Sequence, residues 1–263
     1  MALEDNPILL SCARLLVGLF IGRENLKLYD RLDWEDNQFN SKDFSYPEYY
    51  QKNYHGISGG YLNSIAPVTY DAVTRFAAPP NETRLRKKAI ALVKNKPKKI
   101  LDLGCGTGSS TLMLKKAFPD AEVIGFDVSP YMLLMAEYKG KQANLDIHWQ
   151  QGLAEATDFD ANEFDLVSIA FLFHETPVEI SQQILNECWR ILKPQGEIIV
   201  VDGNQKRLRR TDWLIELFRE PYSKVYAAED INNWLRNAGF SNMETNSAGW
   251  ISQITTGIKN KAK

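Results

Sequence analysis

The sequence predicts an α/β protein with a doubly wound, mostly parallel sheet that ends in a C-terminal antiparallel hairpin. Three observations predict it. From Lys98 onward, apolar runs rich in β-branched residues alternate with helical stretches, a glycine-rich turn follows the first run, and two strand patterns lie close together near the end of the chain. Strands that alternate with helices are typical of parallel sheets with right-handed crossovers. The 263 residues, 44% of them hydrophobic, suffice for one large domain with a substantial core.

The expected elements follow in order along the chain. Asn81 can cap a helix that runs to about Lys94. Apolar patterns predict strands at residues 100–103, 123–126, 166–170 and 198–201, with a weaker strand at 145–149. Helical patterns cover residues 110–118, 130–139, 178–192 and 230–237. The short link between strand patterns at 241–245 and 250–257 predicts the antiparallel hairpin.

The N-terminal part of the chain follows a different pattern. Residues 1–80 lack the alternation of strand and helix, and six tyrosines stand close together in them: Tyr46, Tyr49, Tyr50, Tyr54, Tyr61 and Tyr70. We therefore predict a helical and aromatic cap or lid over residues 1–80, and the α/β domain over residues 81–263.

Composition limits the kinds of binding partner and the cellular compartment that we expect for this chain. A formal net charge of −2 argues against a nucleic-acid partner, which usually requires a basic excess. The three cysteines are irregularly spaced and suggest neither disulfides nor a metal site, so a reducing, cytoplasmic setting is expected. Residues 8–21 are apolar but too short and too interrupted to span a bilayer comfortably. They are expected to pack as an amphipathic helix, and a peripheral membrane contact is the alternative.

A glycine-rich turn carries the strongest functional signal. Gly104, Gly106 and Gly108 follow a predicted strand and open a predicted helix, where glycine lets the backbone approach a ligand closely. The spacing is not that of a dinucleotide fingerprint, because Ser109 occupies the place of its third glycine. Asp127 ends the next strand 23 positions after Gly104, a spacing typical of a carboxylate that binds ribose hydroxyls. Capping of the next helix is the alternative role for Asp127.

These motifs resemble those of a known family. Residues 101–108 (LDLGCGTG), Asp127, residues 164–167 (FDLV), residues 192–197 (LKPQGE) and residues 238–240 (AGF) are similar, in order, to the motifs of class I, Rossmann-like S-adenosylmethionine-dependent methyltransferases. The resemblance implies S-adenosyl-L-methionine as the cofactor. It also implies these cofactor-binding residues: Asp102, Gly104, Cys105, Gly106, Gly108, Asp127, Val128, Met132, Leu153, Ala154, Glu155 and Ala170.

One segment departs from the family pattern. Leu153 stands where relatives often carry an aspartate that contacts the adenine amino group. The backbone of Ala154 and the carboxylate of Glu155 or Asp158 are the expected substitutes, and a solvated loop acid is the alternative for both carboxylates.

His174 is the first candidate for a catalytic base. It directly follows the fourth predicted strand, at the sheet edge where ligands bind, and its ordinary pKa suits proton transfer near neutrality. His55 and Tyr50, with the neighbouring tyrosines, form the second candidate group. The alternatives are a histidine that shapes the pocket and aromatic rings that only pack the cap onto the sheet.

Two basic runs stand out in the sequence. The first combines Arg84, Arg86, Lys87 and Lys88 with the lysines of residues 94–99, and the second comprises Lys206, Arg207, Arg209 and Arg210. A solvated face is the expectation for both runs. The second follows the fifth predicted strand, and could instead meet an acidic substrate or anionic headgroups.

The resemblance implies C- or O-methylation of a small molecule, such as a phenolic, quinone-like or other secondary metabolite. Protein or other macromolecule methylation is one alternative. Residues 170–174 (AFLFH) lack the Asp/Asn-Pro-Pro-Tyr pattern of base-amine methylating enzymes. A cofactor-binding module without catalysis is the other alternative, because a fold alone does not establish function. The sequence leaves the oligomeric state open.

Overall fold

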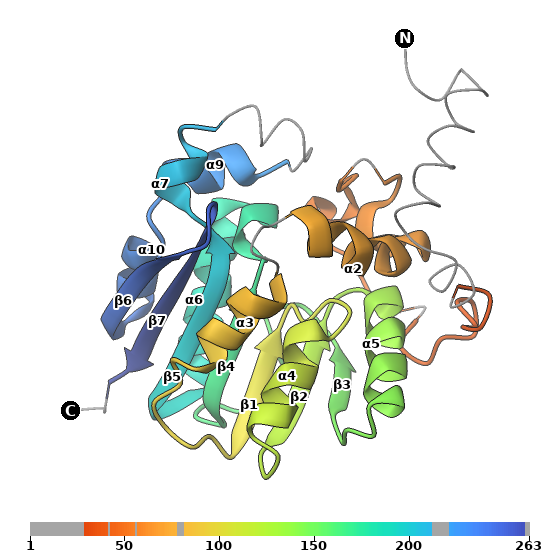
Figure 1. The fold of residues 1–263 in the computed structure, drawn as a ribbon, viewed down its shortest axis with the longest axis horizontal. Coiled ribbons are helices and arrows are strands. Elements are labelled where there is room, and N and C mark those ends of the chain that lie inside the picture. The colour runs from red at the N-terminus through yellow and green to blue at the C-terminus, as the bar shows by residue number, and fades with distance from the viewer. Residues whose placement is uncertain (1–28, 42, 56, 78–81, 212–220, 261–263) are drawn as a thin grey trace.

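A seven-stranded sheet forms the centre of the molecule (Figure 1). The structure is a computed structural model that describes residues 29–41, 43–55, 57–77, 82–211 and 221–260. The strand order is β3-β2-β1-β4-β5-β7-β6, in which β7 runs antiparallel to both β5 and β6. The strands are β1 (Lys99–Leu103), β2 (Glu122–Asp127), β3 (His148–Gln151), β4 (Phe164–Ala170), β5 (Leu192–Gly203), β6 (Phe240–Ala248) and β7 (Ser252–Lys259). The predicted doubly wound sheet with its C-terminal antiparallel hairpin is confirmed.

Helices cover both faces of the sheet. The α-helices are α2 (Ile65–Ala77), α3 (Glu82–Ile90), α4 (Ser109–Ala117), α5 (Pro130–Gln142), α6 (Val178–Ile191), α7 (Gln205–Leu208), α9 (Ser223–Ala228) and α10 (Ile231–Ala238). The short 3-10 helices are η2 (Glu48–Gln51), η3 (Gly60–Leu62) and η4 (Phe173–Glu175). Side chains alternate across each strand. In β1, Ile100 therefore packs with residues of α3 and α4, while Leu101 and Leu103 pack with residues of α6 and α10.

Several element bounds differ from the sequence prediction. Strand β3 begins three residues later than predicted, because Asn144 adopts a positive φ of 51° and residues 145–147 lie outside the strand. Strand β5 begins six residues earlier, because Leu192 already pairs with Phe164 before a register shift. Asn81, the predicted cap of α3, lies outside the described residues.

We call the described residues between 29 and 77 the aromatic segment. This segment lies over the carboxyl edge of the parallel strands and against α5 (Figure 1). Tyr61, from η3, accepts a hydrogen bond on its carbonyl oxygen from the Ser129 hydroxyl at 2.6 Å. Asp71, from α2, accepts from Thr107 at 2.5 Å and pairs with Lys139 at 2.7 Å. These polar contacts join the segment to the glycine turn and to α5. The division of the chain at residue 80 stays a prediction.

The predicted apolar helix at residues 8–21 lies outside the described residues. Within the part of the chain that the structure describes, none of the helices has the length and apolar character needed to cross a bilayer.

Candidate active site

The three glycines of the turn have different surroundings. Gly104, Gly106 and Gly108 adopt positive φ angles of 68°, 52° and 76°, a region that disfavours other residues. A Cβ atom on Gly106 would meet nothing within 4 Å, whereas one on Gly108 would lie 2.7 Å from the Trp149 ring. Gly106 therefore keeps space open beside the turn, and Gly108 lets α4 pack closely on β3.

Asp127 connects the glycine turn to the start of α5. Its carboxylate accepts the Gly106 N–H at 2.7 Å and the Ser129 N–H at 2.9 Å. A carboxylate has about four acceptor positions, so these two hydrogen bonds leave capacity for a ligand. The side chain that caps α5 is Ser129, whose hydroxyl accepts from the Met132 N–H at 3.2 Å. Burial raises the pKa of Asp127 to about 6, although both backbone hydrogen bonds lower it.

A cavity lies between the glycine turn and the aromatic segment. It contains about 720 Å³ of empty space, including the part open to solvent. The predicted site residues that line it are Tyr50, Gly104, Gly106, Asp127, Val128, Met132, Ala154 and Ala170. The structure thus brings together predicted residues from the aromatic segment, β2, β4, α5 and the loops beside them.

The other predicted cofactor-binding residues lie behind or beside this lining. Asp102 is buried and accepts the Thr111 hydroxyl of α4 at 2.6 Å. Cys105 is buried in a cluster with Trp149, and Leu153 bridges to Ala156. Glu155 accepts the Tyr49 hydroxyl at 2.9 Å, so this carboxylate has a partner within the aromatic segment.

Tyrosine rings form the wall of the cavity opposite the glycine turn. Tyr49, Tyr50, Tyr54, Tyr61 and Tyr70 all line it. The Tyr54 and Tyr61 rings stack with centroids 5.3 Å apart, and the Tyr50 ring lies 6.3 and 6.2 Å from them. Burial raises the pKa of Tyr50, Tyr54 and Tyr61 above its ordinary value. The phenols are therefore neutral near pH 7, and the wall presents apolar ring faces with hydroxyl tips.

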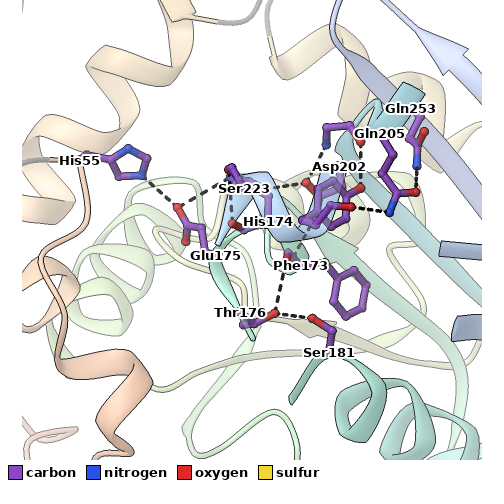
Figure 2. Close-up of polar contacts among 12 residues, drawn as sticks. His55, Phe173, His174, Glu175, Thr176, Ser181, Asp202, Gln205, Ser223 and Gln253 are labelled. Carbon is purple, nitrogen blue, oxygen red and sulfur yellow. Dashed lines mark hydrogen bonds and ion pairs between the residues drawn. The ribbon is translucent and has the colours of Figure 1, made fainter. Parts of the chain in front are cut away.

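Glu175, in η4, is the charged residue that the sequence reasoning missed. It lines the cavity, and its Oε1 atom accepts the Tyr61 hydroxyl at 2.5 Å and lies 2.9 Å from His55 Nε2 (Figure 2). Burial acts to raise the pKa of Glu175, but hydrogen bonds from His55 and Tyr61 and the nearby histidine charges bring it below its ordinary value. Glu175 is therefore ionised near neutrality.

His174 lies next to Glu175 but not among the residues that line the cavity. Its Nδ1 atom is 2.6 Å from the buried Asp202 carboxylate, and its Nε2 atom is 3.8 Å from Glu175 Oε1 (Figure 2). Asp202 also accepts the Phe173 N–H at 2.9 Å. The end of β5 thereby fixes the ring of His174, because a carboxylate on Nδ1 favours the tautomer with its proton there.

Phe171 turns the chain out of β4. It adopts a positive φ of 61°, unusual for a bulky side chain, and it lines the cavity. Arg86 places its guanidinium 5.2 Å from the centre of the Phe171 ring and pairs with Glu82 at 2.9 Å. Arg86 is buried, so its prediction as part of a solvated face is wrong. Its partners Glu82, Ser110 and Phe171 stabilise the charge away from solvent.

Comparisons with known proteins agree with this arrangement. Residues 100–196 match a family model described as a methyltransferase domain. The chain is 33% identical over 187 residues to an uncharacterized methyltransferase of Synechocystis sp., covering 66% of this chain and 83% of the relative. It is 38% identical over 142 residues to a demethylmenaquinone methyltransferase of Thermus thermophilus, covering 54% of this chain and 63% of the relative. A demethylmenaquinone methyltransferase of Lactobacillus johnsonii is 33% identical over 166 residues, with 62% of this chain and 65% of the relative covered. The chain thus spans less than two thirds of the length of these last two relatives.

Solved structures show the same fold. One is from Methanococcus maripaludis and is named a putative S-adenosyl-L-methionine-dependent methyltransferase. It superposes with a TM-score of 0.60 at 19% identity, covering 77% of this chain and 95% of that one. Human N-acetylserotonin methyltransferase superposes with a TM-score of 0.58 at 18% identity, covering 76% of this chain and 58% of that one. The architecture is therefore the Rossmann-like methyltransferase fold. With the identity and coverage of the Synechocystis relative, the chain belongs to the class I S-adenosylmethionine-dependent methyltransferase family.

Proposed function

We propose that this chain transfers a methyl group from S-adenosyl-L-methionine to a small, ring-shaped apolar acceptor, on a carbon or an oxygen that loses a proton. One observation carries the proposal. A single cavity has the glycine turn and Asp127 on one side, and a tyrosine wall with the ionised Glu175 on the other.

The residues beside the glycine turn fit the donor. Gly106 leaves open space where any side chain would project, and Asp127 has acceptor capacity for the two ribose hydroxyls. Val128, Met132 and Ala154 give an apolar lining suited to the adenine ring. Asp102, Cys105 and Gly108 support the turn from behind. When bound, the donor supplies an electrophilic methyl group on a positively charged sulfur.

The tyrosine wall is evidence for an aromatic or quinol-like acceptor. The hydroxyls of Tyr54 and Tyr61 donate within the protein, so these two rings give the wall its apolar surface and hold Tyr50 beside them. The Tyr50 ring can then stack on a flat acceptor ring. The aromatic segment also covers one side of the cavity, which limits the access of water and favours alignment of acceptor and donor. Relatives named demethylmenaquinone methyltransferases support a quinone-like acceptor class.

Glu175 and the histidines beside it are the groups that we assign to the acceptor proton. Glu175 faces the cavity, and His55 and His174 lie 2.9 Å and 3.8 Å from its Oε1 atom. Histidine is the side chain most often used for general acid–base catalysis, and its neutral form is the one that takes up a proton. Asp202 holds His174 in the orientation for this role. Of these three groups, Glu175 is the one that lines the cavity, so the proposed route carries the proton from the acceptor to Glu175 and on to His174 or His55. Tyr50 positions the acceptor ring.

Methyl transfer to a defined acceptor tests the proposal. The purified chain is incubated with donor carrying a labelled methyl group and with chemically reduced 1,4-naphthoquinone, a soluble quinol without ring methyl groups. We expect labelled, methylated quinol and an equal amount of S-adenosylhomocysteine. Absence of labelled product, in a preparation that binds S-adenosylhomocysteine, would reject the quinol-like acceptor class.

A further inference from the structure

A group of exposed basic and apolar residues lies beside the active site. We call it the basic rim, and it comprises Lys206, Arg207, Arg209, Arg210, Lys224, Val225 and Trp250. Gly203, the last residue of β5, pairs with Ser252, so the turn that carries Trp250 lies at the carboxyl edge of the parallel strands. Ala170, which ends β4 at this same edge, lines the cavity. In Figure 1, α7 and α9 lie together above that edge, next to the end of the β6–β7 hairpin.

Two arginines of the basic rim have structural partners. Arg207 donates to the carbonyl oxygens of Gly249, at 3.1 Å, and of Trp250. Arg209 donates to the carbonyl oxygens of Ala227, at 2.5 Å, and of Glu229, at 2.7 Å. These bonds brace α7 between the hairpin turn and the end of α9. The rim is therefore a joined surface and not a set of separate side chains.

Two further cations of the basic rim are Lys206 and Arg210. Both are exposed: Lys206 lies in α7, and Arg210 lies in the turn that follows this helix. Among the residues that the structure describes, neither forms an ion pair within 4.0 Å. Among the described acids near α9, Glu229 and Asp230 are partly buried, and Asp230 caps α10 by accepting the Asn232 N–H at 2.9 Å. Like charges in this arrangement repel, so the rim favours an anionic partner.

Large apolar side chains accompany these charges. Trp250 is 53% exposed and Val225 is 50% exposed. Cations combined with an exposed tryptophan fit the boundary of an anionic membrane, where indole rings lie at headgroup level and basic side chains meet lipid phosphates. Nucleic acid fits less well, because the whole chain carries a net charge of −2.

We infer that the basic rim binds anionic lipid headgroups and holds the cavity edge of the molecule against a membrane surface. The inference goes beyond the proposed function and does not depend on the acceptor. It rests on residues of the basic rim and makes no use of residues 8–21. Binding is electrostatic and interfacial, so it requires both the Lys206/Arg210 charges and the Trp250 ring.

Vesicle flotation tests the inference on the full chain. The probes are vesicles of phosphatidylglycerol and phosphatidylcholine in about equal parts, and vesicles of phosphatidylcholine alone, at about 0.1 M salt where surface charges are only partly screened. We expect flotation with the anionic vesicles only, and release in about 0.5 M salt. The double variant Lys206→Glu/Arg210→Glu and the single variant Trp250→Ser should each weaken vesicle binding at least about tenfold.

A second pair of cations gives the matched control. Lys87 and Lys88 are also exposed and lie on α3, so Lys87→Glu/Lys88→Glu makes the same change in net charge at another surface. This variant should bind like the wild type. Equal loss in both charge variants, unchanged binding after the rim substitutions, or failure of the wild type to float would overturn the inference. Stronger binding to a DNA duplex than to anionic vesicles would also overturn it.

Two further measurements keep the result interpretable. Methyl transfer to the soluble quinol should be unchanged in the rim variants, so loss of vesicle binding and loss of catalysis are distinguishable. If the charge-reversal variant has a lower thermal midpoint than the wild type, the neutral variant Lys206→Gln/Arg210→Gln is used in its place. Release of the wild type from vesicles by salt tests the electrostatic part of the inference without any variant.

Discussion

His55 places its Nε2 atom 2.9 Å from Oε1 of Glu175, although 120 positions of sequence separate the two residues. The same carboxylate oxygen accepts the Tyr61 hydroxyl. Glu175 follows β4, whereas His55 and Tyr61 belong to the aromatic segment. One buried carboxylate therefore joins the tyrosine wall to the edge of the sheet and faces the cavity between them.

Removal of the Glu175 charge should impair turnover more than donor binding. We expect Glu175→Gln to lower kcat by about 10²-fold, the lower range for loss of proton-transfer catalysis, because the charged carboxylate that faces the cavity and pairs with His55 disappears, while His174 keeps Asp202. Affinity for S-adenosylhomocysteine should stay within about threefold, since Asp127 and Gly106 on the donor side of the cavity are unchanged. Steady-state kinetics and calorimetry measure the two quantities. Glu179→Gln, on the exposed face of α6, is the matched control.

The three histidines of the chain should separate into two classes. His174→Ala should reduce turnover and spare donor affinity, because it removes the ring held by Asp202, and His55→Ala should act in the same direction. His148 is exposed on β3, so His148→Ala should have wild-type kinetics. Wild-type turnover in His174→Ala would restrict His174 to packing.

Asp127 should control donor affinity and its dependence on pH. Asp127→Ala should weaken donor binding by about 1.5 kcal/mol or more, because two hydrogen bonds to a charged acceptor disappear. Burial raises the pKa of Asp127 to about 6. The ionised carboxylate is the form that accepts two hydroxyls, so affinity should be complete above that pKa and fall as pH decreases below it, up to tenfold per pH unit. Calorimetry with S-adenosylhomocysteine between about pH 5 and 8 tests this.

Asp127→Asn supplies the control for that pH dependence. The amide does not titrate, so its weaker binding should lack the change near pH 6. A profile in Asp127→Asn with the same slope as the wild type would assign the titration to another group.

Substitution of two neighbouring glycines should separate binding from stability. Gly106→Ala places a methyl group in open space beside the cavity, so it should reduce donor affinity and cost only the strain of its positive φ, about 1 kcal/mol. Gly108→Ala places its methyl group 2.7 Å from the Trp149 ring, and the free energy of unfolding should fall by a further 1–3 kcal/mol, roughly, from overpacking. Thermal and denaturant unfolding, compared with calorimetry, distinguish the two variants. An equal loss of stability in both would contradict the packing role of Gly108.

Local sequence patterns predicted most of the fold. The periodicity of residues 100–103 and 123–126, with the glycines between them, was enough to place β1, β2 and the turn, because each signal is contained in one short stretch. The position of Asp127 at the end of β2 could be predicted for the same reason, because its spacing from Gly104 is set within one strand–helix–strand unit.

The centre of the candidate site could not be predicted in this way. Glu175 has no local signal, because its partners His55 and Tyr61 lie 120 and 114 positions away and reach it only through the fold of the aromatic segment. Arg86 is a similar case. Its sequence neighbours are basic, yet Glu82, Ser110 and Phe171 surround it in a buried position.

Calorimetric titration of the purified wild-type chain with S-adenosylhomocysteine tests most directly whether the chain has a donor site, on which the proposed methyl transfer depends. We expect one site per chain with micromolar affinity, weakened by at least about tenfold in Asp127→Ala. Absence of binding, both alone and with the reduced naphthoquinone present, would contradict a donor site between the glycine turn and the tyrosine wall.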